Sequence, residues 1–215
     1  MTNKFETYLE YLLQKRYSEA LRIINESNLK DVLDIGCNVG NGCAFLGAIG
    51  VDIDNELLIK AKKRKRLEVI RCDAQYLPFR SMTFDIITCF EVIEHVERPR
   101  QLLNEVFRTL KSEGSFLLTT PNKNFLKIAR PLAGKKKPNY HIEEYNSGQL
   151  KKIVLDSGFI EIKVEGLGAW LPGFLIRRFP KLSDYLGKVG LDYTFSCKAK
   201  KPNARSNSNS GDLSA

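Results

Sequence analysis

The chain has 215 residues and a formal net charge of +9, and 43% of its residues are hydrophobic. This length provides for one domain with a sizeable core, and no apolar run approaches the roughly 20 residues that a membrane-spanning helix needs. The first residues lack the apolar segment of a signal peptide, so we expect a cytoplasmic protein. The excess of positive charge is compatible with an anionic partner, which would be a nucleic acid, an acidic substrate or a membrane surface, and equally with lysine-rich helix faces on a soluble protein.

The five cysteines are scattered along the chain and lie mostly inside apolar runs. Their number is odd and no pair has the spacing of zinc ligands, so we expect buried free thiols in a reducing compartment. Cys37 lies in a glycine-rich turn, but no basic residue near it would activate it as a nucleophile.

Hydrophobic periodicity predicts helices and strands that alternate along most of the chain. One or two amphipathic helices over 5–24 come first. The predicted strands lie at 32–35, 48–52, 67–71, 84–89, 115–119, 159–164 and 193–200. Helices are predicted at 41–46, 56–66, 99–110 and 147–156. This order predicts an α/β fold with a Rossmann-like, seven-stranded, mainly parallel sheet, helices on both faces and an antiparallel last strand. The last two strands are expected to pair at the sheet edge.

We expect a single domain over residues 1–201, which begins with N-terminal helices over 1–28. The Asn- and Ser-rich residues 202–215 are expected to be disordered, because this composition cannot bury a core.

Two basic and aromatic segments, 122–146 and 166–191, do not belong to the alternating scaffold and are expected to be substrate or lid insertions. Short amphipathic helices at 125–130 and 170–185 would present basic and apolar side chains to a membrane interface. The alternative is a lid whose apolar face covers the active site.

A glycine-rich turn follows the first predicted strand. Gly36 and Gly40 can adopt backbone angles that are closed to other residues, which lets a ligand approach the main chain closely. A strand, a tight turn and a helix start are the order in which doubly wound sheets build nucleotide pockets. Asp34 lies at the carboxyl end of the strand, where such sheets bind ligands.

Acidic residues follow the next three predicted strands: Asp52 the second, Asp73 the third and Glu91 the fourth. The carboxyl ends of parallel strands lie side by side along one crevice. A carboxylate after the second strand can accept hydrogen bonds from ribose hydroxyls. An Asp after the third strand can accept one from an exocyclic amine such as that of adenine. The pattern therefore predicts a nucleoside pocket.

These motifs resemble those of class I S-adenosylmethionine-dependent methyltransferases of types 11 and 12. The matching segments are Val32-Leu33-Asp34-Ile35-Gly36-Cys37 with Gly40, Gly50-Val51-Asp52-Ile53-Asp54, Asp73-Ala74, and Phe84-Asp85-Ile86-Ile87 before Glu91. The resemblance implies that S-adenosylmethionine is the cofactor, that Asp52 binds its ribose and that Asp73 binds its adenine amine. The cofactor-binding residues it implies are Asp34, Gly36, Cys37, Asn38, Gly40, Asp52, Ile53, Asp73, Ala74 and Glu91.

The sequence departs from this family's pattern in two places. Asn38 stands where the turn usually has its middle glycine, and Asn tolerates left-handed backbone angles better than most residues, so we expect the turn to keep its shape. The segment between Gly42 and Asp52 is short, which leaves room for one or two helical turns and would open the pocket.

The chain has two histidines, His95 in Glu91-Val92-Ile93-Glu94-His95 and His141 further on. On a helical turn Glu91 and Glu94 or His95 project from one face, and we expect His141 to fold over them. Histidine titrates in the range that is useful for deprotonating a hydroxyl acceptor. The predicted catalytic residues are therefore His95, His141 and Glu94.

The Glu91-x-x-Glu94-His95 motif resembles that of quinone-biosynthesis O-methyltransferases and, with the later histidine, that of metal-dependent small-RNA 2′-O-methyltransferases. The second resemblance would place a divalent metal on Glu91, Glu94, His95 and His141. We do not assign a metal, because the motif is equally explained if Glu91 lines the cofactor pocket and His95 makes a polar contact.

Three functions are compatible with these motifs. The first is O-methylation of a small or lipid-linked hydroxyl compound, with peripheral membrane contact through 122–146 and 166–191. The second is 2′-O-methylation of RNA, which the basic surface would bind. The third is cofactor binding without catalysis, and the intact Asp52, Asp73 and Glu91 argue against it. These motifs identify neither the methyl acceptor nor the oligomeric state.

Overall fold

The computed structural model describes residues 4–27, 30–65, 67–132, 134, 136–169 and 192–203. Most of the predicted insertion at 166–191, with its expected helix at 170–185, lies outside the described residues. The predicted disorder of the tail falls mainly on residues 204–215, which lie outside them too. Of the helices that are described, none combines the length and the apolar character needed to cross a membrane.

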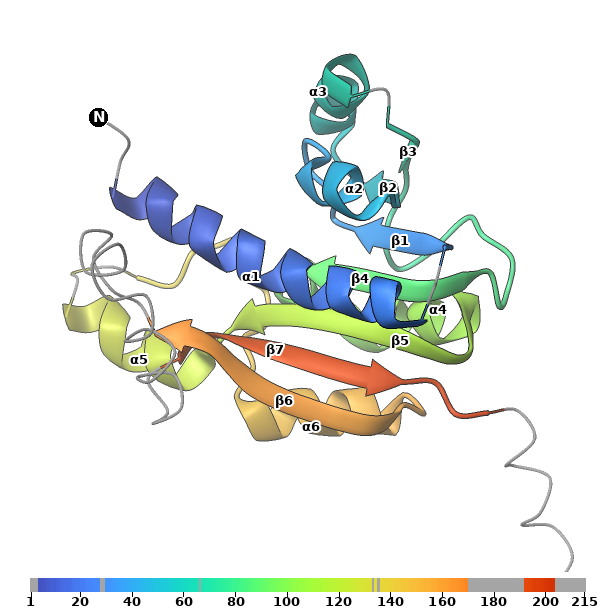
Figure 1. Ribbon diagram of the computed structural model, residues 1–215. Helices are drawn as coiled ribbons and strands as arrows, with labels where there is room; N and C mark the ends of the chain where they lie inside the picture. Colours follow the sequence, from blue (N-terminus) through green and yellow to red (C-terminus); the bar gives the residue numbers. More distant parts are fainter. Residues whose placement is uncertain are drawn as a thin grey trace, which may run out of the picture.

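The centre of the molecule is a seven-stranded sheet with the order β3-β2-β1-β4-β5-β7-β6 (Figure 1). Its strands are β1 (Val32–Ile35), β2 (Ile49–Asp52), β3 (Val69–Arg71), β4 (Phe84–Phe90), β5 (Leu110–Pro121), β6 (Ile160–Ala169) and β7 (Asp192–Lys200). The first five strands are parallel. Strand β7 is antiparallel to both β5 and β6. The predicted fold class, including the antiparallel last strand and the edge pair, is confirmed.

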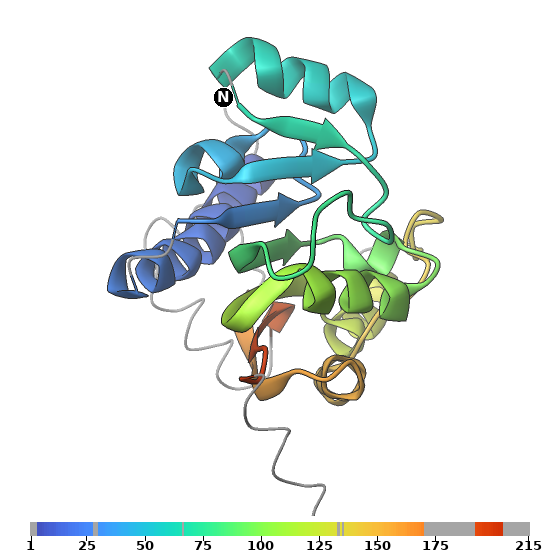
Figure 2. The same cartoon turned by 90° about the vertical axis from the view of Figure 1, so that its right-hand side faces the viewer.

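Helices cover both faces of this sheet (Figure 2). They are α1 (Lys4–Ser27), α2 (Asn41–Leu46), α3 (Asn55–Lys65), η1 (Ile93–His95), α4 (Pro99–Thr109), α5 (Lys123–Leu132) and α6 (Ser147–Asp156). The N-terminal region is one long helix rather than several. Ala20 and Ile23 of α1 pack with Ile86 of β4 in one core cluster. Val106 of α4 and Val154 of α6 belong to the cluster on the opposite face.

The side chains of β1 alternate between the two faces, as a strand requires. Leu33 and Ile35 belong to the cluster with α4 and α6. Val32 belongs to the cluster with α1. Asp34, two residues further, therefore points toward the α1 face and not toward the helices behind the sheet.

Helix α3 begins one residue earlier than predicted and α6 begins at the predicted residue, and both are capped by a side chain. The Asp54 carboxylate accepts hydrogen bonds from the amides of Glu56 and Leu57 at the start of α3. Asn146 caps α6 in a reciprocal pair with Gln149. In both cases the residue just before the helix provides the side-chain acceptor.

The registers bring the carboxyl ends of the central strands together. Ile35 at the end of β1 pairs with Val51 of β2 on one side and with Cys89 of β4 on the other. Asp52 at the end of β2 pairs with Arg71, the last residue of β3. The loops that follow these strands therefore share one edge of the sheet, where the sequence predicts the pocket.

Candidate active site

A cavity of about 650 Å³ lies at this edge of the sheet. Residues from the four predicted motifs form much of its wall: Gly36 and Asn38 after β1, Asp52 and Ile53 at β2, Asp73 and Ala74 after β3, and Glu91 after β4. The carboxylates that follow successive strands thus face one space. A cavity of this size is typical of small-molecule and cofactor sites.

The turn after β1 depends on left-handed backbone angles. The φ angles of Gly36, Asn38 and Gly40 are 74°, 52° and 76°, so Asn38 adopts the angle that we expected it to tolerate. A Cβ atom at Gly36 would collide with the side chain of Val92. The Gly36 amide donates to the carbonyl of Val51 at 2.8 Å, which ties the turn to β2.

Asp52 and Asp73 are both held by neighbouring donors. Oδ2 of Asp52 accepts from the Asn38 amide at 2.8 Å and Oδ1 accepts from the Asp54 amide at 3.0 Å. Oδ1 of Asp73 accepts from the amide of Gln75 at 2.8 Å. Both carboxylates are therefore oriented before any ligand arrives, as a preorganised site requires.

Three of the predicted cofactor residues, Asp34, Cys37 and Gly40, are not part of the cavity wall. Asp34 lies beneath the turn, where it is 3% exposed. Thr88 donates to its Oδ1 at 2.7 Å. Burial raises the pKa of Asp34 to about 6, against the opposing effect of this hydrogen bond. Its observed contacts stabilise the base of the turn.

Glu91 connects the cavity wall to the N-terminal helix. Its Oε1 accepts from Arg16 of α1 and from Thr119 of β5, each at 3.0 Å. The φ angle of Glu91 is 57°, which is uncommon for a residue with a side chain.

Glu94 is a buried carboxyl group next to the cavity, with 1% of its surface exposed. Thr120 donates to its Oε2 at 3.0 Å, whereas Oε1 has no hydrogen-bond partner among the described residues. Burial, and then the charge of Glu91, raise the pKa of Glu94 to about 8. The group is therefore positioned to hold a proton near neutral pH.

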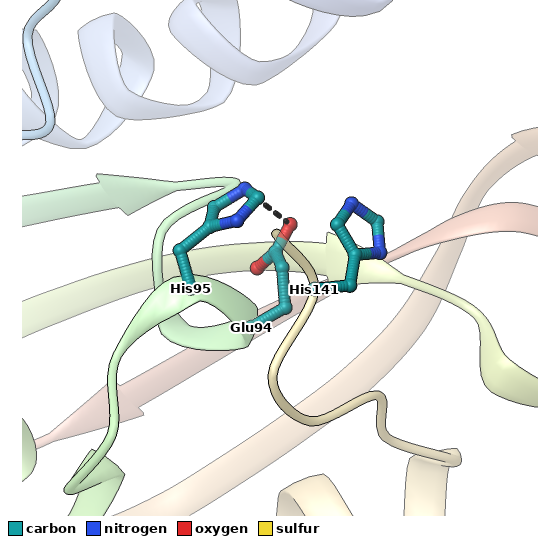
Figure 3. Close-up of side chains that lie close together, drawn as sticks. All are labelled: Glu94, His95 and His141. Carbon is teal, nitrogen blue, oxygen red and sulfur yellow. Dashed lines mark ion pairs between the residues drawn. The ribbon is translucent and has the colours of Figure 1, made fainter. Parts of the chain in front are cut away.

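The segment that carries His141 is fastened to η1 by backbone hydrogen bonds. The amides of Ile142 and Glu143 donate to the carbonyl of Glu94 at 2.8 and 3.2 Å. As a result the two histidine rings lie edge to face with their centroids 5.0 Å apart. Figure 3 shows both rings beside the Glu94 carboxylate, so the structure brings together the three predicted catalytic residues. Of the three residues, His95 is the one in the cavity wall.

Two residues that the sequence analysis did not single out hold His141. Nδ1 of His141 lies 2.8 Å from Oε1 of Glu144. Arg130 of α5 binds the same carboxylate through both of its terminal nitrogens, at 2.6 and 2.9 Å. Because Glu144 follows His141 by three residues, its proximity had a local signal, but the contribution of Arg130 depends on how α5 packs.

The three residues that could share a metal are Glu94, His95 and His141, whose ligand atoms lie within 4.8 Å of one another. Donor atoms around a tetrahedral zinc ion lie about 3.4 Å apart, given bonds of about 2.1 Å. The ligand atoms of Glu94, His95 and His141 can therefore lie farther apart than the donor atoms of a closed tetrahedral zinc site. Glu91, the fourth candidate ligand, is occupied by Arg16 and Thr119. A metal held by all four predicted ligands would need Glu91 to bind it through its other oxygen, or to give up the contacts of Oε1 with Arg16 and Thr119.

The wall also contains residues that the sequence analysis missed, among them Gln75, Arg98 and Ile142. Gln75 Oε1 accepts from the Arg98 amide at 3.0 Å and so links the loop after β3 to the start of α4. None of the three belongs to a strand-end motif, and only the fold brings them to the cavity. Of the cysteines, Cys72 lines the cavity and the other four are buried free thiols.

The family model described as "Methyltransferase domain" matches residues 33–118. A probable S-adenosylmethionine-dependent methyltransferase of Mycobacterium tuberculosis is 28% identical over 152 residues, covering 68% of this chain and 54% of that protein. An uncharacterized protein of Methanocaldococcus jannaschii is 30% identical over 203 residues, covering 90% of this chain and 76% of that protein. A ubiquinone biosynthesis O-methyltransferase of Coxiella burnetii is 34% identical over 106 residues, covering 45% of each.

The crystal structure of an S-adenosylmethionine-dependent methyltransferase from Archaeoglobus fulgidus has the same fold. The two chains are 21% identical with a TM-score of 0.67, over 91% of this chain and 94% of that one.

The sheet order, the carboxylates around the cavity and these similarities define the class. The chain contains a methyltransferase domain over residues 33–118 and is similar in sequence and fold to S-adenosylmethionine-dependent methyltransferases, and S-adenosylmethionine is the cofactor of that family. The chain spans about half the length, 54%, of the mycobacterial relative that it matches.

Proposed function

We propose that this protein transfers the methyl group of S-adenosylmethionine to the hydroxyl group of a small or lipid-linked compound. The observation that carries the proposal is that His95, which lines the cavity, has His141 and Glu94 directly beside it (Figure 3). A hydroxyl acceptor must lose its proton near the transfer step, and a positioned histidine is the usual base for this. A neutral amine acceptor already has a lone pair available and needs no such base.

In the proposed complex the cofactor occupies the cavity of about 650 Å³. Asp52 would bind the ribose hydroxyls and Asp73 the adenine amine, while the turn after β1 would hold the methionine part. The main contribution of the protein to the rate would be to hold the acceptor oxygen in line with the methyl group.

The surface next to the histidines supports a lipid-linked acceptor. A groove of about 440 Å³ between α5 and the segment that carries His141 is lined by Lys123, Lys127 and Ile142, among others. Ile142 also lines the cofactor cavity, so the two spaces adjoin. Ile128 of α5 is 68% exposed, and exposed apolar and basic side chains together are typical of helices that lie on anionic membranes. The similarity to a ubiquinone biosynthesis O-methyltransferase supports the same class of acceptor.

To test this, the protein is incubated with methyl-labelled S-adenosylmethionine and with pairs of acceptors. The two members of a pair share an apolar chain and differ only in whether they carry a hydroxyl or an amine. We expect label on the hydroxyl compounds, more of it when they are embedded in anionic vesicles, and little on the amines. His141→Ala is expected to lower turnover by about 10²- to 10⁴-fold, the usual contribution of a general base. Lys136→Ala, an exposed change in the same segment, is the control.

RNA is included as an acceptor in the same assay. Transfer to RNA that falls steeply with added salt would favour RNA 2′-O-methylation and contradict a lipid-linked acceptor. Cofactor binding without transfer to any hydroxyl would contradict the proposed function.

A further inference from the structure

Glu144 makes a short contact with His141 in a sheltered position. The Nδ1–Oε1 distance is 2.8 Å, and the exposed fractions of the two side chains are 12% for His141 and 8% for Glu144. Burial raises the pKa of Glu144, but the hydrogen bonds from Arg130 and His141 outweigh burial and leave the pKa below its usual value. Glu144 is therefore ionised near neutral pH and can only accept hydrogen bonds.

An acceptor at Nδ1 determines which nitrogen of a neutral imidazole carries the proton. Because Glu144 only accepts, the proton of His141 lies on Nδ1, and Nε2 keeps its lone pair. A terminal nitrogen of Arg130 also lies 3.5 Å from Nδ1. The guanidinium and the Nδ1–H group are both donors and cannot bond to each other, so the Glu144 carboxylate accepts a hydrogen bond from each.

Arg130 fixes the plane of this carboxylate. It binds one oxygen through each terminal nitrogen, at 2.6 and 2.9 Å, and bidentate pairs of this kind restrict orientation as well as distance. Arg130 belongs to α5, the helix that forms one side of the neighbouring groove. The orientation of His141 is thereby coupled to the packing of α5.

His95 provides an internal comparison. Its Nδ1 lies 2.8 Å from the backbone carbonyl of Tyr140, which also only accepts, so His95 has the same tautomer for a different reason. Besides Glu144 and Arg130, the groups that face His141 are His95, Tyr140 and Glu94. None of these is close to Nδ1 in the described contacts.

We propose that Glu144, held by Arg130, is the positioning residue of His141: it keeps the proton on Nδ1 and leaves Nε2 as the base for the methyl acceptor. This inference rests on the proposed function. In the reaction, the hydroxyl proton passes to Nε2 and the oxygen bonds to the methyl carbon. The carbon–sulfur bond breaks with its electrons going to sulfur, and Glu144 stabilises the imidazolium that forms.

Because the chain has only two histidines, nuclear magnetic resonance can read both tautomers directly. Two-bond ¹H–¹⁵N spectra of protein labelled at histidine nitrogens are recorded at a pH where both rings are neutral, and His95→Gln assigns the signals. We expect both histidines of the unsubstituted protein to be protonated on Nδ1. Protonation of His141 on Nε2 would overturn the proposal.

Glu144→Leu removes the acceptor and is expected to move His141 toward the Nε2–H tautomer that free imidazole prefers, while His95 stays unchanged. Glu143→Leu, at the adjacent exposed position, is the matched control and is expected to leave both rings as they are. An unchanged His141 tautomer in Glu144→Leu would also overturn the proposal.

A changed His95 signal would show that Glu144→Leu does not fold correctly, and Glu144→Gln would then replace it. Its amide offers either an oxygen or an NH₂ group, so a mixture of His141 tautomers is expected, and Nδ1–H alone would count against the proposal.

The kinetic readout separates this role from a structural one. With a hydroxyl acceptor, Glu144→Leu is expected to lower kcat by about 10- to 100-fold, within the usual contribution of acid–base catalysis, and to leave the KM for the cofactor unchanged. If Glu144→Leu raised the KM for the cofactor and left kcat unchanged, this would contradict a positioning role for Glu144. Failure of all methyl transfer would contradict the proposed function and would not alter the tautomer result.

Discussion

Arg16 of α1 and Glu91 after β4 lie 75 positions apart in the sequence and form an ion pair of 3.0 Å. The Arg16 side chain is 6% exposed and that of Glu91 is 28% exposed. The pair holds the N-terminal helix against the wall of the cavity. The site thus depends on a helix that lies outside the strand-end motifs.

Replacing Arg16 tests this dependence. Arg16→Leu is expected to lower the free energy of unfolding by about 2 kcal/mol, less than the loss for a fully buried pair, because Glu91 keeps some contact with water. Chemical denaturation measures the change. Arg22→Leu, which removes exposed ion pairs on the same helix, is the control and is expected to have little effect. If Arg16→Leu and the unsubstituted protein unfolded at the same denaturant concentration, this would show that the Arg16–Glu91 ion pair does not stabilise the fold.

Gly36→Ala tests the geometry of the turn. A side chain at a φ of 74° costs about 1–2 kcal/mol, and the new methyl group also collides with Val92. We expect reduced thermal stability and at least tenfold weaker cofactor binding. Gly148→Ala, in the first turn of α6 where an added Cβ meets only one atom within 4 Å, should leave both properties nearly unchanged. Normal cofactor affinity in Gly36→Ala would contradict the proposed contact between turn and cofactor.

The burial of Glu94 predicts a pH dependence of stability. The pKa of this group is raised from 4.5 to about 8 in the folded state, so between these values the folded protein binds more protons than the unfolded chain. Stability must then fall as pH rises through this window. Glu94→Gln removes the titration and should become progressively more stable relative to the unsubstituted protein from pH 4.5 to about 8. Denaturant unfolding at a series of pH values measures this, and parallel curves would refute the raised pKa.

The proposed membrane contact of α5 makes a separate prediction. Ile128→Asp places a negative charge at the apolar side chain of this helix that is the most exposed of those the structure describes, at 68%. We expect about tenfold weaker co-sedimentation with anionic vesicles, because both apolar burial and charge attraction are lost. Ile59→Asp on α3, where the side chain is 43% exposed, is the matched control. Similar vesicle binding by the two variants would exclude α5 as the contact.

The sequence predicts the scaffold because the signals for it are local. The apolar strands, the glycines of the turn and the acidic residues after β2, β3 and β4 can all be recognised within short windows, and the parallel sheet brings them together. That the turn tolerates Asn38 in place of the family's usual glycine is likewise predicted from the residue type, and the left-handed angle agrees with it. The alternation along β1 also carried the information that Asp34 faces α1, although its position at the strand end favoured a ligand contact.

The contacts that complete the site are long-range and have no local pattern. Arg16 reaches Glu91 only because α1 crosses the sheet, and Arg130 reaches Glu144 only because α5 packs beside the segment that carries His141. The juxtaposition of His95 and His141 depends on two backbone hydrogen bonds to the carbonyl of Glu94. The sequence suggested that these histidines meet, but not what orients them.

Isothermal titration calorimetry with S-adenosylmethionine tests most directly whether this cavity is the cofactor site. We expect the unsubstituted protein to bind one cofactor per chain and Asp52→Ala to bind it about tenfold to a hundredfold more weakly, since hydrogen bonds to a charged group contribute about 1.5–3 kcal/mol. Asp156→Ala, at the end of α6 and outside the cavity wall, should bind like the unsubstituted protein. Failure of the unsubstituted protein to bind S-adenosylmethionine, or unchanged affinity in Asp52→Ala, would contradict the assignment.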